Sequence, residues 1–151
     1  MRAFCARMGA TVPQRKALVL KASRILLSEK PLPERLQAFL EALLEGPFPI
    51  RSGKLYLRKG EGLRLVAQLG GEAGGEEVAL SLEGGGRALG RLSLRLAPAA
   101  SLAPEDRLAL EEAAGILALA LLRERAERAE RVLRRAGECA TQAAGEGDLL
   151  H

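Results

Sequence analysis

The chain has 151 residues and a formal net charge of +4 at pH 7, so its length suits one domain with extensions. Aromatic residues make up only 3% of it, which argues against a surface that stacks nucleic-acid bases and against an aromatic cofactor cage. The modest charge is not a nucleic-acid signature by itself, and we expect no nucleic-acid partner. Asparagine is absent and arginine outnumbers lysine, which fits a thermophile, although a GC-rich genome would give the same bias.

The cysteine and histidine content excludes several kinds of site. Cys5 and Cys139 lie near opposite ends of the sequence and form no disulfide framework, which is typical of a reducing, cytoplasmic setting. No CxxC motif is present and His151 is the only histidine, so we expect no metal site and no cofactor. The longest apolar run, residues 113–122, is about half of the ~20 residues that a membrane span requires, and we expect no membrane association.

The first part of the chain predicts two helices. Residues 1–12 have no apolar period and are expected to be flexible. Residues 13–30 are predicted to be a helix with an apolar face wide enough to meet a second chain in part. A second helix begins at Pro33 and ends before Gly46, because proline suits a first helical turn and glycine a helix end.

Four segments with a period of two predict four strands joined as two hairpins, each with one buried and one wet face. The first hairpin comprises residues 54–58 and 63–68, and the second comprises residues 78–82 and 87–96. On this pattern the buried face carries Leu55, Leu57, Leu63, Leu65, Val78, Leu80, Leu82, Ala88, Gly90 and Leu92, and the wet face carries Tyr56, Arg64, Leu89, Arg91 and Arg95.

The last helix is predicted to begin at Pro104, where Glu105 and Asp106 face the positive end of the helix dipole. It is apolar on two stripes, and therefore we expect it to be covered on two sides. Residues 123–136 continue it as a coiled-coil-like extension, and residues 137–151 are expected to be a disordered tail. The heptad seam of the extension consists of Leu119, Leu122, Ala126, Ala129, Leu133 and Ala136.

The region from about residue 32 to 125 resembles a GAF domain. The resemblance rests on the segment GRALGRLSL from Gly86, the sequence Pro104-Glu-Asp, and the Leu- and Ala-rich helix that follows. It implies an α+β fold with a GAF/PAS-like, four-stranded antiparallel sheet in the order 2-1-4-3, packed on one face by N- and C-terminal helices. The element order would be α-α-β-β-β-β-α, with a GAF-like domain at residues 31–122. Roadblock-like folds show similar patterns.

The chain departs from the family between the two hairpins. GAF domains have helices and a further strand there, which roof a small-molecule pocket, whereas this chain has only the glycine-rich residues 69–77. Such a segment makes a turn or loop and no roof. We therefore expect the wet face of the sheet to be open, solvated and basic. In an alternative hypothesis, this face keeps a reduced site for an anionic nucleotide at Tyr56, Arg64, Arg91 and Arg95.

No catalytic arrangement is recognisable in the sequence, and we expect no enzyme. Some GAF-like enzymes reduce methionine sulfoxide with cysteines around the pocket, but neither cysteine of this chain falls in the matched region. The predicted function is a non-catalytic regulatory or scaffolding module that acts through a signalling partner protein. The alternatives are the nucleotide sensor and a roadblock-like scaffold that pairs sheets edge to edge. The expected homodimer interface consists of Leu18, Ile25, Leu119, Leu122 and Leu133.

Overall fold

The computed structural model describes residues 10–71 and 74–149, with side chains placed for residues 10–71 and 74–138. The chain divides into one unit that ends at Ala120 and a second that begins at Leu121. The described elements follow the predicted order α-α-β-β-β-β-α. They are α2 (Val12–Leu26), α3 (Leu32–Glu45), β1 (Ile50–Lys59), β2 (Gly62–Gly70), β3 (Glu77–Gly84), β4 (Arg87–Leu96) and α4 (Pro104–Leu149).

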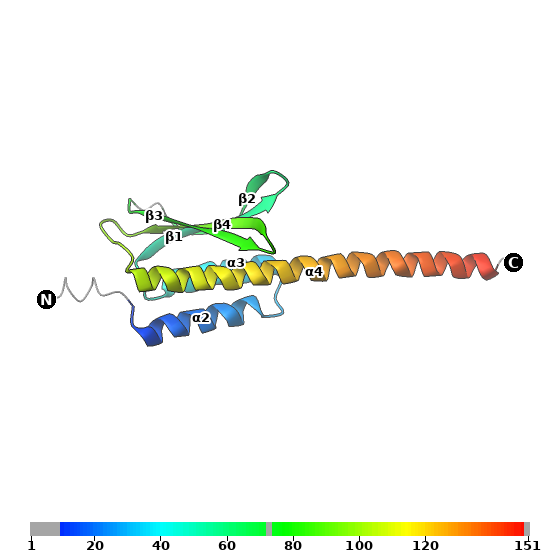
Figure 1. Ribbon diagram of the computed structural model, residues 1–151, viewed down its shortest axis with the longest axis horizontal. Coiled ribbons are helices and arrows are strands. Elements are labelled where there is room, and N and C mark those ends of the chain that lie inside the picture. The colour runs from blue at the N-terminus through cyan, green and yellow to red at the C-terminus, as the bar shows by residue number, and fades with distance from the viewer. Residues whose placement is uncertain (1–9, 72–73, 150–151) are drawn as a thin grey trace. The chain divides into compact units, whose positions relative to one another are not determined.

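The four strands form one antiparallel sheet in the order β2-β1-β4-β3, which confirms the predicted fold and strand order. In the first unit, α3 and the start of α4 lie against one face of this sheet, and α2 packs on the far side of these helices (Figure 1). We call the opposite face of the sheet the outer face. The core between sheet and helices is almost entirely aliphatic: Phe39, Leu40, Leu43, Leu55, Leu82, Leu92, Leu94, Leu110 and Leu117 are fully buried.

Helix α2 begins at Val12, one residue earlier than predicted. A capping box that was not predicted sets this start. The Thr11 side chain accepts a hydrogen bond from the Gln14 backbone at 3.3 Å, and the Gln14 side chain accepts one from the Thr11 backbone at 2.8 Å. The helix ends at Leu26 rather than at residue 30. Of the flexible segment expected at residues 1–12, Thr11 and Val12 therefore belong to the start of α2, and residues 1–9 lie outside the described residues.

A β-bulge in the first hairpin overturns the predicted faces of β2. Leu55 pairs with Ala67, but the next residue, Tyr56, pairs with Leu65, so Val66 is the extra residue. Because side chains alternate between faces, a shift of one residue moves every later side chain to the other side. Leu63 and Leu65 therefore lie on the outer face, and Arg64 lies opposite Leu57 on the helix-covered side.

The second hairpin contains a similar irregularity. Leu82 pairs with Gly90 and Glu83 pairs with Ala88, which leaves Leu89 as the extra residue. Leu89 is buried and Ala88 is exposed, so the prediction for these two positions was wrong. The strict alternation of the sequence carries no sign of either bulge.

The second unit, from Leu121, consists of the continuation of α4. Arg123 and Glu127 form an ion pair at 3.0 Å, and Arg131 and Glu124 form one at 3.7 Å. The helix continues to Leu149, where a disordered tail was expected. The predicted helix ended before Gly137, but no proline follows, and each of Gly137, Gly145 and Gly147 costs only about 1 kcal/mol relative to alanine.

Candidate functional site

A cluster of charged side chains lies on the outer face, where β3 and β4 run side by side. Its centre is Glu77, whose carboxylate lies 3.6 Å from Arg91 and 3.5 Å from Arg95. The Ser93 hydroxyl donates a hydrogen bond to the same carboxylate. That hydrogen bond, and then the charges of Arg95, Arg91 and Lys54, hold the pKa of Glu77 below its ordinary value of 4.5, against a smaller opposing effect of burial. Glu77 is therefore an anion at neutral pH and neutralises part of the basic face.

A groove of about 560 Å³ adjoins this cluster, at the end of the sheet where β2 leaves for β3. Arg95 belongs to both, and its guanidinium donates a hydrogen bond to the Gly75 carbonyl at 3.1 Å. Cationic, hydroxyl and amide donors converge there, which is the chemistry that binds an anion. The groove is lined by Ser52, Gly53, Lys54, Gln68, Leu69, Gly70, Gly71 and Arg95.

The connection between the hairpins approaches the sheet too closely for side chains. Gly70 has a φ of +86°, and a Cβ there would lie 2.2 Å from the Arg51 carbonyl oxygen. A Cβ on Gly75 would lie 2.1 Å from the Leu96 carbonyl oxygen. The described part of residues 71–76 contains no helix or strand. Gly70 lines the groove, and the described part of this connection supplies no helix or strand that roofs it.

Three of the four predicted ligand residues share the outer face. Tyr56 pairs with Arg91, and Arg95 pairs with Glu77. The fourth, Arg64, is wrong as a member of this set because the bulge at Val66 turns it to the other face. Lys54 and Ser93 lie on this face too, as their alternation with Leu55 and Leu94 predicts, but they were not among the four predicted ligand residues.

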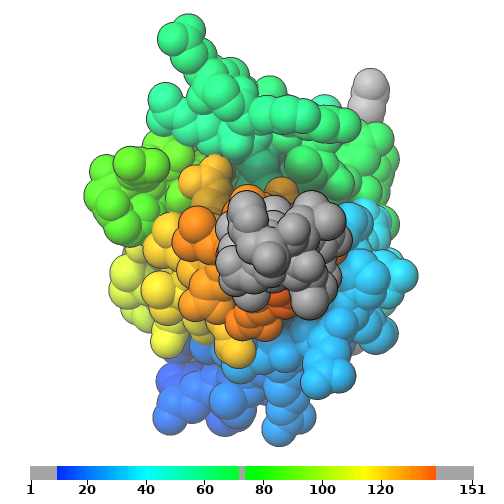
Figure 2. All heavy atoms as spheres, turned by 90° about the vertical axis from the view of Figure 1, so that its right-hand side faces the viewer, coloured from blue at the N-terminus to red at the C-terminus, as the bar shows by residue number. Residues whose placement is uncertain are grey.

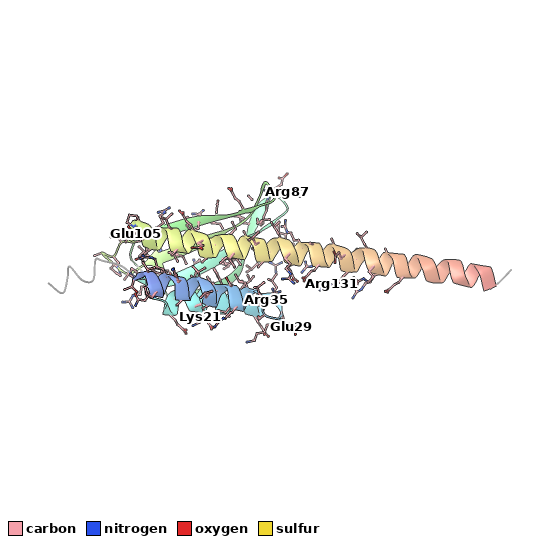
Figure 3. All side chains as sticks on the ribbon, turned by 60° about the horizontal axis from the view of Figure 1, so that its bottom comes forward. Lys21, Glu29, Arg35, Arg87, Glu105 and Arg131 are labelled. Carbon is pink, nitrogen blue, oxygen red and sulfur yellow. The ribbon has the colours of Figure 1, made fainter. Side chains whose placement is uncertain are left out.

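A second, largely apolar groove of about 510 Å³ lies between α2 and the first turns of α4. Leu20 and Leu108, which line it, are exposed leucines on the two helices. Its rim is charged, with basic residues on α2 and acidic residues on α4. Figure 3 labels one of the acidic residues, Glu105, at the start of α4. The lining residues are Val12, Arg15, Lys16, Val19, Leu20, Glu105, Leu108, Ala109 and Glu112.

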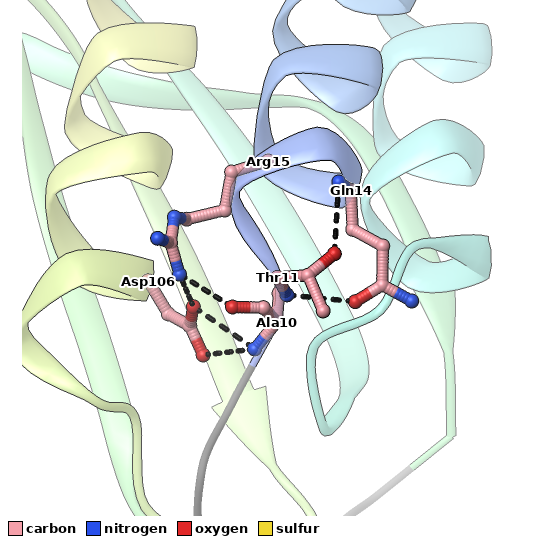
Figure 4. A network of polar contacts seen from close by, with 5 residues as sticks. All are labelled: Ala10, Thr11, Gln14, Arg15 and Asp106. Carbon is pink, nitrogen blue, oxygen red and sulfur yellow. Dashed lines mark hydrogen bonds and ion pairs between the residues drawn. The ribbon is translucent and has the colours of Figure 1, made fainter.

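A buried carboxylate fixes one end of this groove (Figure 4). Both oxygens of Asp106, in the first turn of α4, accept hydrogen bonds from the Ala10 backbone at 3.2 Å. Arg15 of α2 lies 3.3 Å from the same carboxylate and also donates to the Ala10 carbonyl. The sequence analysis assigned Asp106 only to the helix dipole, because nothing in the sequence relates it to a residue 96 positions earlier. This contact holds the starts of α2 and α4 together.

The predicted dimer residues fall into different environments. Leu18 is only 4% exposed and packs inside the fold, so it is wrong as an interface residue. Ile25 is half-buried, and Leu119 is exposed. In the second unit Leu122 is half-buried and Leu133 is exposed.

The part of the chain that the structure describes lacks two features. It contains no group of three or more His, Cys, Asp or Glu side chains that could hold a metal ion. None of its helices has a stretch long and apolar enough to cross a membrane. Cys5 and the side chain of Cys139 lie outside the described residues.

Comparison with solved structures identifies the fold. The GAF domain of a phosphoenolpyruvate-protein phosphotransferase from Coxiella burnetii matches with a TM-score of 0.64 at 14% identity, over 80% of this chain and 99% of that one. A GAF domain from A. aeolicus in an inactive state matches with a TM-score of 0.58 at 12% identity, over 74% of this chain and 98% of that one. No protein-family model and no curated protein matches the chain. The chain has a GAF-like fold, as its resemblance implied.

The same fold also occurs in enzymes. Free methionine-R-sulfoxide reductase from Neisseria meningitidis, in complex with its substrate, matches with a TM-score of 0.65 at 18% identity, over 78% of this chain and 95% of that one. This overturns the expectation that the chain is not an enzyme, since the fold serves catalysis as well as regulation. At this identity the likeness establishes the fold and assigns no reaction.

Proposed function

We propose that the chain is a regulatory module with a GAF-like fold that self-associates through α2 and the first turns of α4 and acts through a partner protein. The observation that carries this proposal is the apolar groove between these helices, which leaves Leu20 and Leu108 exposed. Exposed aliphatic side chains that gather in one groove mark an interaction site more often than scattered ones do.

The charges around the groove favour a second copy of the chain as its occupant. Arg15 and Lys16 belong to α2, whereas Glu105 and Glu112 belong to α4. A two-fold axis that sets α2 of one protomer against α4 of the other brings opposite charges together on both sides of the axis. The apolar residues between them then exclude water from the centre of the interface.

Light scattering of the full chain tests this proposal. We expect a dimer at micromolar concentration and a monomer for the double variant Leu20→Glu/Leu108→Glu, because each change buries a carboxylate in the apolar interface. Leu63→Glu is the matched control, since Leu63 is a similarly exposed leucine on β2. A monomeric native chain contradicts the proposal. A dimer that survives the double variant but dissociates with Leu63→Glu supports the roadblock-like, edge-paired scaffold instead.

A second candidate function is the sensing of a small anion in the groove at Lys54 and Arg95. It is supported by the donors that converge there. We expect one member of a panel of nucleoside mono-, di- and triphosphates to raise the melting temperature by a few degrees, because a ligand that binds only the folded state stabilises it. Arg95→Gln should abolish the shift, and Arg87→Gln, an exposed β4 arginine outside the groove, should preserve it. A panel without any shift contradicts this function.

A further inference from the structure

Among the described strands, the exposed large aliphatic side chains all belong to β2. Leu63, Leu65 and Val66 are 52%, 42% and 37% exposed, and the other exposed large aliphatic residues of the described chain lie on helices or, for Leu27, in the turn that follows α2. The hairpin of β1 and β2 projects from the sheet in Figure 1 and stands at the top of the view in Figure 2, in blue-green. No described element of the chain covers these three side chains.

The position of β2 leaves its backbone partly available as well. It is an edge strand that pairs only with β1. At its far end the Gln37 side chain of α3 donates a hydrogen bond to the Gln68 carbonyl at 3.3 Å, so this end of the edge is covered. Among the described residues, no side chain hydrogen-bonds to the backbone of residues 63–66. Unpaired edge groups beside exposed aliphatic side chains are the features that recruit a further strand.

Cations flank this stretch. Arg58 lies on the outer face opposite Leu63, Lys59 precedes the turn, and Arg64 lies within β2. The Arg58 guanidinium donates a hydrogen bond to the Gly60 carbonyl. None of these three side chains makes an ion pair with a described residue. A second β2 strand carries the same charge at Arg64, so like-charge repulsion opposes self-pairing. A strand that carries carboxylates is instead attracted to Arg64.

We propose that residues 63–66 of β2 bind an extended segment of a partner protein in which acidic and aliphatic residues alternate. The segment adds a fifth strand to the sheet by pairing with the free edge of β2. Its aliphatic side chains cover Leu63 and Leu65, and its carboxylates face Lys59 and Arg64. This inference rests on the proposed role of the chain as a module that acts through a partner, and it supplies the surface for that partner.

A pair of synthetic peptides tests the charge preference. One decapeptide alternates glutamate with valine and the other alternates lysine with valine, and binding to the full chain is followed by fluorescence anisotropy. We expect the acidic peptide to bind at least about tenfold more tightly, with an affinity that falls as salt is added. The double variant Lys59→Glu/Arg64→Glu should reverse this preference, whereas Arg91→Gln, on the outer face, should leave it unchanged.

Backbone pairing is tested separately from charge. An acidic peptide N-methylated at alternate residues keeps its charges but cannot complete the strand hydrogen bonds, and we expect it to lose binding. The unmethylated acidic peptide should shift the amide resonances of residues 63–66.

Equal binding of the unmethylated acidic and basic peptides, no binding, or a loss of binding in Arg91→Gln overturns the inference. So do assemblies of the chain alone that grow with concentration and dissolve in Leu63→Glu, because β2 is then occupied by a second copy. Light scattering of the native chain measures self-association separately from peptide binding, so the peptide inference and the self-association proposal can fail independently.

Discussion

The two edge strands of the sheet have similar sequences and opposite environments. In β3 the residues Val78, Leu80 and Leu82 alternate with exposed positions and are buried against the helices. In β2 the residues Leu63 and Leu65 alternate just as regularly and are exposed, and only Ala67 is fully buried. The bulge at Val66, which turns Leu63 and Leu65 to the outer face, accounts for this difference. Alternation therefore indicates that a strand has two faces, but the register decides which face meets the core.

The comparison predicts a large difference between matched substitutions in the two strands. Leu82→Ala should lower the free energy of unfolding by about 2–5 kcal/mol, because it leaves a cavity at a fully buried position. Leu63→Ala should change it by no more than about 0.5 kcal/mol, since the side chain is largely in water already. Urea denaturation monitored by circular dichroism measures both values. Similar losses for the two variants would contradict the register at Val66.

Strands β1 and β4 pair at the centre of the sheet and hold the two edge strands. The lack of a side chain at Gly90 allows β1 and β4 to lie this close. A Cβ at this position would lie 2.2 Å from the Tyr56 carbonyl oxygen, so Gly90→Ala must push the two strands apart. We expect a loss of about 1–3 kcal/mol in the free energy of unfolding.

The control for this variant is Gly115→Ala in α4, where a Cβ would meet nothing within 4 Å. Alanine should stabilise a helix at such a position by about 0.5–1 kcal/mol. A neutral Gly90→Ala variant would show that β1 and β4 can separate at little cost.

The smallest expected effect concerns the ion pairs that cross-link β3 to β4, which have no counterpart between β2 and β1 among the described residues. Because the pKa of Glu77 is lowered in the folded state, the unfolded chain takes up its proton near pH 4.5 and the folded chain only at lower pH. The contribution of Glu77 to stability is therefore complete above the unfolded pKa and is lost as the pH falls through the folded pKa.

Denaturant titrations of the native chain and of Glu77→Gln over this pH range measure that contribution. The small difference in unfolding free energy between the two should be constant at neutral pH and shrink in acid. A difference that grows in acid would contradict the lowered pKa.

Much of the fold could be predicted because it depends on local chemistry. Pro33 lies in the first turn of α3 and Gly46 is its C-cap, and the period of two marks all four strands. The candidate site was predicted in part: Tyr56, Arg91 and Arg95 do share the outer face, but Arg64 does not. An inserted residue in a ladder depends on the partner strand, and a single sequence carries no record of that partner.

The sequence by itself determined the order of the elements, the aliphatic core of the sheet and helices, and the short glycine-rich connection between the hairpins. These follow from periodicity and from the backbone preferences of glycine and proline, which act within a few residues. Only the tertiary structure decided that Leu65 is exposed, that Leu18 is buried and that Asp106 binds the start of α2. Each of these depends on segments far apart in the chain, and their packing sets which side chains leave water.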